Sequence, residues 1–442
     1  MPSILRPKAL RSGDVVAVAA LSGGLEQGEA SLFERGVEAI ERMGFVVHVS
    51  PVVGLDRGWW WAAARPREVA KEFNRLLRDP EVRAIFALTG GRMTPSYLDL
   101  IDYGGVRADP KPLLGFSDIS TLHLALHACT GLVSLHSELV TYGFGEWNEL
   151  DDARRTELED LYLRVLTSDD APGPLPPGRP WESWRSGRAQ GPLIGGLLNR
   201  LVRVQATPYA LSPERFDGAI LFWEEVGTST AAIWNDLHLL RTAGVLDRIA
   251  GMVVGATEVE LTEGGGTLRE VVLDALDKRP LPVLGNVDIG HDGSNLPMPL
   301  GTRAEVDADA RDALAAGAGG RPILSIGSGA GLETARSPQA PCGPYDARGR
   351  RTSRTSTCSG RRPRTALASG LRGSCCQQSS VRLYRDRTVR HPSERQTRPT
   401  AYVRGPSPEV MGLLPDNRSD PASGKLAPDC LIESSSSSGS GS

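Results

Sequence analysis

The sequence predicts an α/β protein with two folded domains and a disordered C-terminal tail. Short apolar runs alternate with segments of helical periodicity through residues 1–332, as in a parallel sheet covered by helices on both faces. A proline-rich stretch interrupts this alternation, and the composition changes abruptly near residue 333. We therefore expect an N-terminal domain at 1–166, a linker loop at 167–190, a C-terminal domain at 191–332 and a tail at 333–442.

The N-terminal domain begins with a buried strand and continues as alternating strands and helices. Leu32, Val37 and Ile40 recur at helical spacing after the first apolar run. The run VRAIFALTGG is apolar almost throughout, as a strand buried on both faces should be. The predicted strands are 14–20, 45–50, 82–91 and 112–117, and the predicted helices are 32–43, 66–79 and 121–129.

Five prolines lie between Pro172 and Pro180, and Trp181 and Trp184 follow them. Proline fixes φ and lacks an N–H donor, so this density excludes a helix or a central strand and indicates a loop. Beyond it, the predicted strands are 218–225, 249–255, 282–290 and 322–326, around a helical segment at 231–243.

The formal charge of −3 is the sum of two dissimilar stretches. Residues 333–442 contain 17 Arg and one Lys against nine acids, whereas residues 1–332 contain 32 bases against 44 acids. Such an asymmetry in charge indicates that the two stretches are structurally different parts of the chain. A nucleic-acid-binding tail is one interpretation of the basic stretch. We favour non-native sequence, such as a shifted reading frame or vector-derived residues.

Composition excludes several classes for residues 1–332. A single cysteine, Cys129, argues against a disulfide framework and a cysteine-rich metal site. The run VVAVAAL at 15–21 is at the short limit for a signal peptide and is better explained as a strand, and no run reaches the ~20 apolar residues that span a bilayer. The net negative charge argues against nucleic acid as a partner. We expect a cytoplasmic protein without a membrane partner.

Reactive side chains in open α/β sheets lie just after the strands. GFSDIS places Ser117 between a strand and a helix, where a tight turn would expose its hydroxyl as a nucleophile. The alternative is that Ser117 and Asp118 only cap the helix. His127 and His136 flank this helix, and we interpret them as helix-surface and loop positions.

Two further strand ends carry candidate catalytic groups. Glu224, with Glu225 beside it, ends the run GAILFW and could orient a histidine, or it is a solvated strand end. His291 lies in the glycine-flanked loop DIGHDGSN, where it is a general base or a bystander.

Two glycine-rich runs also follow strands. The glycines of TGGR (89–92) expose backbone N–H groups suited to an oxyanion hole beside Ser117, or they form a simple turn. GSGAG (327–331) mimics a dinucleotide-binding fingerprint, but no helical pattern or suitably placed acid follows it, so we reject it.

Together these segments resemble the serine peptidase family that contains the LD-carboxypeptidases and the microcin C immunity proteins. The resemblance runs from PKALRSGDVVAVAA to about residue 302, and the order and separation of its blocks make it specific. The blocks are TGG (89–91), LDLIDY (98–103), GFSDISTLHLALHACTGLVSLH (115–136), GPLIGGLLNRL (191–201), ILFWEEVG (220–227), LRTAGVLDRIAGMVVG (240–255) and NVDIGHDGSNLPMPLG (286–301).

The resemblance implies a glutamine-amidotransferase-like nucleophile domain, a smaller C-terminal α/β domain of the swivelling type, and a Ser–Glu–His triad across both. By motif the nucleophile is Ser117, the orienting acid Glu224 and the base His291, with Glu225 as the alternative acid. No metal or organic cofactor is implied, and the family is commonly dimeric.

The same resemblance implies that the backbone N–H groups of Gly91 and Asp118 are the oxyanion donors and that Gly90 lies at the substrate site. In the microcin-immunity branch an aromatic loop residue stacks on a nucleotide base. Trp181 or Trp184 would do this here, with packing between domains as the alternative.

The motif NVDIGH and the Trp-bearing linker favour the microcin-immunity branch of the family. Members of that branch cleave an amide that joins a peptidyl or aminoacyl part to a nucleotide-like group. The alternative is a murein tetrapeptide LD-carboxypeptidase of cell-wall recycling, and another class is a catalytically silent, ligand-sequestering protein. Two segments depart from the family pattern, GGRMTPSYLDLID and HSELVTYGFGE. These departures do not affect the triad residues, but they leave the substrate preference undecided.

Overall fold

The computed structural model describes residues 3–53, 59–257, 259–260, 265–309 and 323–327. All of them fall within one compact unit of the chain. The predicted tail at 333–442 lies outside the described residues, as do residues 328–331 of the rejected glycine-rich run.

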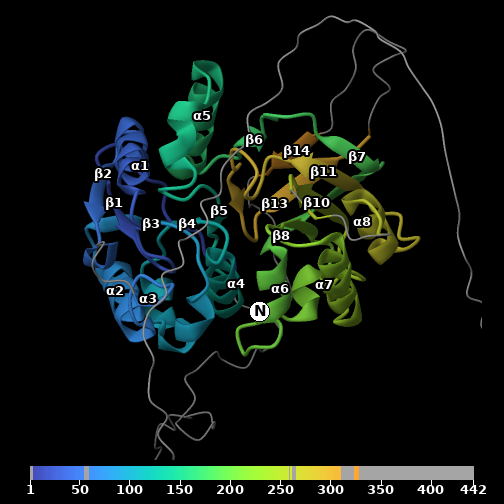
Figure 1. Ribbon diagram of the computed structural model, residues 1–442, viewed down its shortest axis with the longest axis horizontal. Helices are drawn as coiled ribbons and strands as arrows, with labels where there is room; N and C mark the ends of the chain where they lie inside the picture. The colour runs from blue at the N-terminus through green and yellow to red at the C-terminus, as the bar shows by residue number, and fades with distance from the viewer. Residues whose placement is uncertain (1–2, 54–58, 258, 261–264, 310–322, 328–442) are drawn as a thin grey trace, which may run out of the picture. The chain divides into compact units, whose positions relative to one another are not determined.

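The described residues form two sheets, of which the first has six strands in the order β12-β5-β4-β3-β1-β2 (Figure 1). Strands β2, β1, β3, β4 and β5 pair in parallel, and β12 pairs antiparallel with β5. The four predicted N-terminal strands are thereby confirmed. The bounds are β1 Val15–Ala19, β2 Val46–Val49, β3 Val82–Ala87, β4 Leu113–Gly115, β5 Leu135–His136 and β12 Met298–Pro299.

Helices cover both faces of this sheet, because alternate residues of its strands are apolar on both sides. Val16 and Val18 of β1 belong to one buried cluster with α1 and α5, whereas Ala17 and Ala19 belong to another with α2 and α3. The three predicted helices are confirmed, while α3 and α5 were not foreseen. The helices are α1 Ala30–Arg42, α2 Pro66–Arg78, α3 Tyr103–Ala108, α4 Ile119–Thr130 and α5 Asp152–Thr167.

The second sheet has eight strands among the described residues, in the order β6-β14-β13-β8-β9-β10-β11-β7 (Figure 1). Its centre, β8-β9-β10-β11, is parallel, and the outer strands are antiparallel. The strands are β6 Gly173–Pro174, β7 Glu182–Arg185, β8 Arg188–Leu197, β9 Ile220–Glu224, β10 Gly251–Gly255, β11 Val283–Val287, β13 Arg303–Asp307 and β14 Ile323–Ile326, and the helices are α6 Leu198–Val204, α7 Thr230–Thr242 and α8 Leu268–Leu276.

The proline-rich segment that was expected to be a loop contributes β6 and β7, at the two ends of this order. Proline is tolerated at a sheet edge because the missing N–H donor can face away from the ladder. The prolines therefore exclude a central strand, as expected, but not an edge strand.

The interpretation of His127 and His136 as helix-surface and loop positions is wrong. His127 is 1% exposed and His136, which lies in β5, is fully buried. Every residue of α4 is buried, so this helix has no surface side in the described structure. Burial lowers the pKa of His127 to about 4 and that of His136 well below its ordinary value, so both imidazoles are neutral.

Among the residues that the structure describes, no helix has both the length and the apolar character needed to cross a bilayer.

Candidate functional site

Ser117 lies on a tight turn between β4 and α4. Its φ is +62°, a left-handed conformation that costs a non-glycine residue about 1–3 kcal/mol. Gly115, two residues earlier, has a φ of +146°, and a Cβ there would lie 2.8 Å from the Cβ of Ala87. Only glycine fits this close approach, so the sequence GFS produces a turn on which the serine is held in a strained, defined position.

His291 and Glu224 meet Ser117 at this turn. Glu224 is the last residue of β9 and is fully buried, and His291 lies in the loop that follows β11. The His291 Nδ1 atom is 2.7 Å from Glu224 Oε2, and its Nε2 atom is 3.0 Å from Ser117 Oγ. With the proton on Nδ1, the imidazole donates to the carboxylate and its Nε2 atom accepts from the serine hydroxyl. The structure thus brings together three residues that the sequence separates widely.

The two adjacent glutamates point to different partners. Glu225 accepts hydrogen bonds from the backbone N–H of Asn199, at 2.9 Å, and from its side-chain amide, at 2.6 Å. Burial raises the pKa of Glu225, while hydrogen bonds from the backbone N–H groups of Val226 and Asn199 oppose the rise. Glu224 is therefore the acid that contacts His291, whereas Glu225 binds Asn199 in the first turn of α6.

The loop that carries His291 is anchored to the first sheet by groups that the sequence analysis did not single out. Asn295 donates its N–H to Glu138 Oε1 at 2.9 Å, and its carbonyl accepts from Tyr162 Oη at 2.7 Å. The Asn295 side chain also accepts from the N–H of Gly290 at 3.2 Å. Burial raises the pKa of Glu138 to about 8, so at neutral pH this anchor is largely protonated.

The loop TGG crosses directly beside Ser117. A Cβ on Gly90 would lie 2.7 Å from Ser117 Oγ, and Gly91 has a φ of +143°. The Asp118 carboxylate makes no capping bond to α4, contrary to the capping alternative. Its Oδ2 atom instead accepts from the N–H groups of Met93 and Thr94, at 2.8 and 2.9 Å. The backbone N–H of Asp118 belongs to the turn that carries Ser117, because Asp118 is the next residue.

A cavity of about 730 Å³ opens over Ser117. Its walls come from both sheets, because Gly91 and Asp118 lie on one side and residues of α6 and α7 on the other. The α6 and α7 residues on this wall include Asn199, Arg200, Arg203, Asn235 and Asp236. A polar wall opposite the serine suits a substrate with charged groups.

Trp181 and Trp184 do not line this cavity. They are 8% and 7% exposed and belong to the large buried apolar cluster that contains residues of both sheets. The Trp181 Nε1–H donates to Asp288 at 2.7 Å, and the Trp184 Nε1–H donates to Glu182 at 2.7 Å. These positions fit the packing alternative, because a ring that stacks on a base needs an accessible face.

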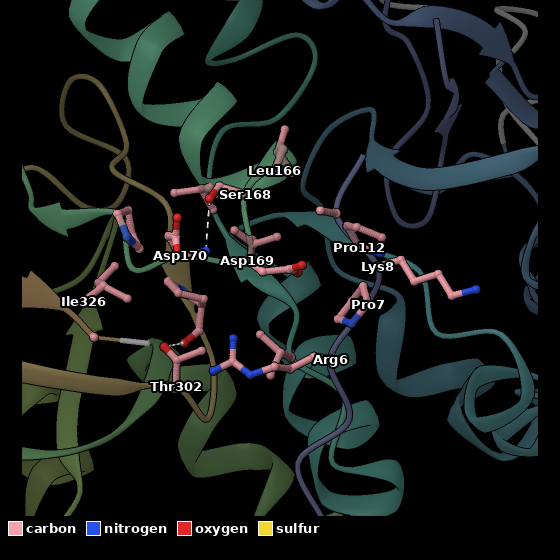
Figure 2. A pocket seen from close by; sticks show the side chains of 17 residues that line it. Arg6, Pro7, Lys8, Pro112, Leu166, Ser168, Asp169, Asp170, Thr302 and Ile326 are labelled. Atoms are coloured by element: carbon pink, nitrogen blue, oxygen red, sulfur yellow. Dashed lines mark hydrogen bonds between the residues drawn. The ribbon is translucent and has the colours of Figure 1, made fainter. Parts of the chain in front are cut away.

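A second cavity, of about 460 Å³, lies at the amino end of β4 and β5, away from Ser117 (Figure 2). Arg6, Pro112, Leu135, Leu166 and Thr302 are among its lining residues, and none of the predicted site residues is. Within the described ranges, no group of three or more His, Cys, Asp and Glu side chains could hold a metal ion.

Comparison with known proteins agrees with this architecture. The family described as "LD-carboxypeptidase N-terminal domain" matches residues 16–137, and "LD-carboxypeptidase C-terminal domain" matches residues 190–306. The chain belongs to the LD-carboxypeptidase family. The resemblance stated from the sequence is thereby confirmed, and the family identifies the chain as carboxypeptidase-like.

Relatives within the LD-carboxypeptidase family carry two kinds of name. The chain is 28% identical to the microcin C7 self-immunity protein MccF of Escherichia coli, over 70% of this chain and 94% of that protein. It is 27% identical to a probable murein peptide carboxypeptidase of Bacillus subtilis, over 70% and 93%. The solved structure of MccF in complex with aspartyl sulfamoyl adenosine superposes with a TM-score of 0.64 at 26% identity, covering 73% of this chain and 98% of that one.

Gly90→Ala should lower turnover by about 100-fold without unfolding the protein. The new methyl group would lie 2.7 Å from Ser117 Oγ, so the serine or the loop must move, and a displacement of about 1 Å costs about 100-fold in rate. The measurement is kcat/KM for any substrate that the wild-type protein hydrolyses. Gly104→Ala, on the exposed face of α3, is the matched control and should keep full activity. Equal activity of both variants would contradict the placement of the TGG loop.

The buried Glu138 should make stability fall as the pH rises. Its pKa is about 8 in the folded protein and near 4.5 when unfolded, so the folded state binds more protons between these values. The melting temperature of the wild type should therefore decline between about pH 5 and pH 8, and Glu138→Gln should flatten that decline. Parallel pH profiles for the two proteins would show that Glu138 is ionised in the fold.

Proposed function

We propose that this protein is a serine hydrolase that cleaves an amide bond through a catalytic triad of Ser117, His291 and Glu224. The observation that carries the proposal is the continuous chain of contacts from Glu224 Oε2 through His291 to Ser117 Oγ, at 2.7 and 3.0 Å. Membership of a family of carboxypeptidases supports the same chemistry. A fully buried carboxylate beside one imidazole nitrogen favours the imidazolium that forms when the other nitrogen takes a proton.

In this mechanism Ser117 Oγ attacks the scissile carbonyl carbon while its proton passes to His291 Nε2. The carbonyl oxygen becomes an oxyanion, for which the backbone N–H groups of Gly91 and Asp118 are the proposed donors. Collapse of the tetrahedral intermediate breaks the C–N bond, and the imidazolium gives its proton to the leaving amine. Water then attacks the acyl-serine with His291 as the base, releasing a carboxylate and restoring the hydroxyl.

We propose a peptidyl or aminoacyl nucleotide analogue as the substrate. The solved relative bound to aspartyl sulfamoyl adenosine supports this class, and so does the 28% identity to the self-immunity protein. The polar wall of the cavity, with Arg203, Asn235 and Asp236, could bind such a charged ligand. The Bacillus subtilis relative supports the second candidate, a murein peptide carboxypeptidase. A silent, ligand-sequestering protein would have no use for the Ser117–His291 contact.

The finer architecture also stands as a proposal. We assign residues 1–166 to a glutamine-amidotransferase-like nucleophile domain and residues 191–332 to a C-terminal domain of the swivelling type, joined through 167–190. A homodimer, a cytoplasmic location and activity without a cofactor follow from the family resemblance and remain predictions.

A substrate panel separates these functions. The protein is incubated in ¹⁸O-labelled water with aspartyl and glutamyl sulfamoyl adenosine and with murein tetrapeptide, and the products are identified by mass spectrometry. We expect one ¹⁸O atom in the released amino acid of the sulfamoyl substrates. Hydrolysis of the tetrapeptide alone would establish the murein function instead.

Ser117→Ala should lower turnover by at least about 1,000-fold, whereas the exposed Ser31→Ala control should not.

Binding without any turnover by the wild type would support the sequestering protein. Undiminished turnover by Ser117→Ala would exclude the serine mechanism.

A further inference from the structure

Arg200 of α6 is a buried cation whose guanidinium contacts three partners beside Ser117. Its Nε atom donates to Asp118 Oδ1 at 2.7 Å, and its Nη2 atom donates to the carbonyl of Gly91 at 3.3 Å. The third partner is Asn199, whose side-chain oxygen accepts from Nη1 at 2.7 Å. The Arg200 residue is 8% exposed and Asp118 is fully buried, so this ion pair is shielded from water.

The guanidinium binds the two residues whose backbone N–H groups are the proposed oxyanion donors. Arg200 binds the side-chain carboxylate of Asp118 and the backbone carbonyl oxygen of Gly91. The guanidinium is planar and its N–H groups form a rigid fork, so two acceptors bound to it are held at a fixed separation. The other oxygen of Asp118 accepts from Ser22 Oγ at 2.7 Å, which ties the same carboxylate to the loop after β1.

The position of Arg200 is itself fixed from the second sheet. Asn199, which accepts from Arg200, is bound through its own N–H and amide to Glu225. Glu225 follows Glu224, the residue that contacts His291. A continuous set of hydrogen bonds therefore leads from the end of β9 through α6 to the turn that carries Ser117.

We infer that Arg200 is a positioning residue that fixes the backbone N–H groups of Gly91 and Asp118 at the separation that an oxyanion requires. The inference rests on the proposed serine mechanism and adds a residue outside the triad. Arg200 touches none of the reacting atoms, and it acts through the two loops that it joins. Backbone donors stabilise an oxyanion only within about 2.7–3.1 Å of it, so a small shift of either loop weakens both bonds.

Two substitutions separate positioning from mere stabilisation of the fold. Arg200→Met removes the charge and all three hydrogen bonds, whereas Arg200→Lys keeps a cation for Asp118 but lacks the planar fork that also reaches Gly91. Arg248→Met is the matched control, because the side chain of Arg248 forms an exposed ion pair with Asp217, and such pairs contribute little to stability. Each protein is assayed as the full chain on the substrate that the wild type hydrolyses.

Positioning predicts a loss of kcat with little change in KM. We expect kcat to fall by about 100-fold in Arg200→Met and by at least about 10-fold in Arg200→Lys, with KM within about threefold of the wild type. The factor should be the same across the pH profile, since His291 is untouched. Arg200→Lys should stay folded at the assay temperature while losing kcat, and Arg248→Met should keep both the fold and the wild-type kcat.

Wild-type kcat in Arg200→Lys or Arg200→Met would overturn the inference, as would a loss that lies entirely in KM. If Arg200→Met does not fold, Arg200→Lys alone decides the question. These results are distinct from failure of the proposed function. In that case the wild type would show no turnover, or Ser117→Ala would remain active, whatever the Arg200 variants do.

Discussion

The contact between His291 and Ser117 depends on the meeting of two sheets. Ser117 follows a strand of the first sheet, whereas Glu224 ends a strand of the second and His291 follows another. Neither sheet contains the complete chain of hydrogen bonds. Any change that separates the carboxyl ends of β4 and β9 would therefore separate Ser117 from His291, even if each sheet stayed folded.

Several features of the chain maintain this meeting point. After His291 the chain returns to the first sheet, where β12 pairs with β5. Asn295, on that return path, is held by Glu138, which follows β5, and by Tyr162 of α5. A further contact joins Arg200 of α6 to Asp118, the residue after Ser117. The site is thus held by polar contacts that are largely buried, where they are stronger than at a surface.

The sequence predicted the strands and the triad candidates because both have local signals. Continuous apolar runs identify buried parallel strands, and a polar residue directly after such a run lies at the edge where sites form. The same local view could not choose between Glu224 and Glu225, which are adjacent and differ only in the partner that each faces. The ion pair of Arg200 and Asp118 joins positions 82 residues apart and has no local pattern. The α4 helix is buried on all sides, so the spacing of its apolar residues does not indicate that His127 is buried.

The contact between His291 and Ser117 is tested most directly by the tautomer that the uncharged His291 imidazole adopts, measured by NMR on a sample labelled with ¹⁵N in histidine. His291→Ala assigns the signal by its loss. We expect the proton to reside on Nδ1, bonded to Glu224, with Nε2 accepting from Ser117, and we expect Glu224→Ala to remove this preference. A proton on Nε2 in the wild-type protein would contradict this expectation, because that tautomer cannot accept the proton of Ser117.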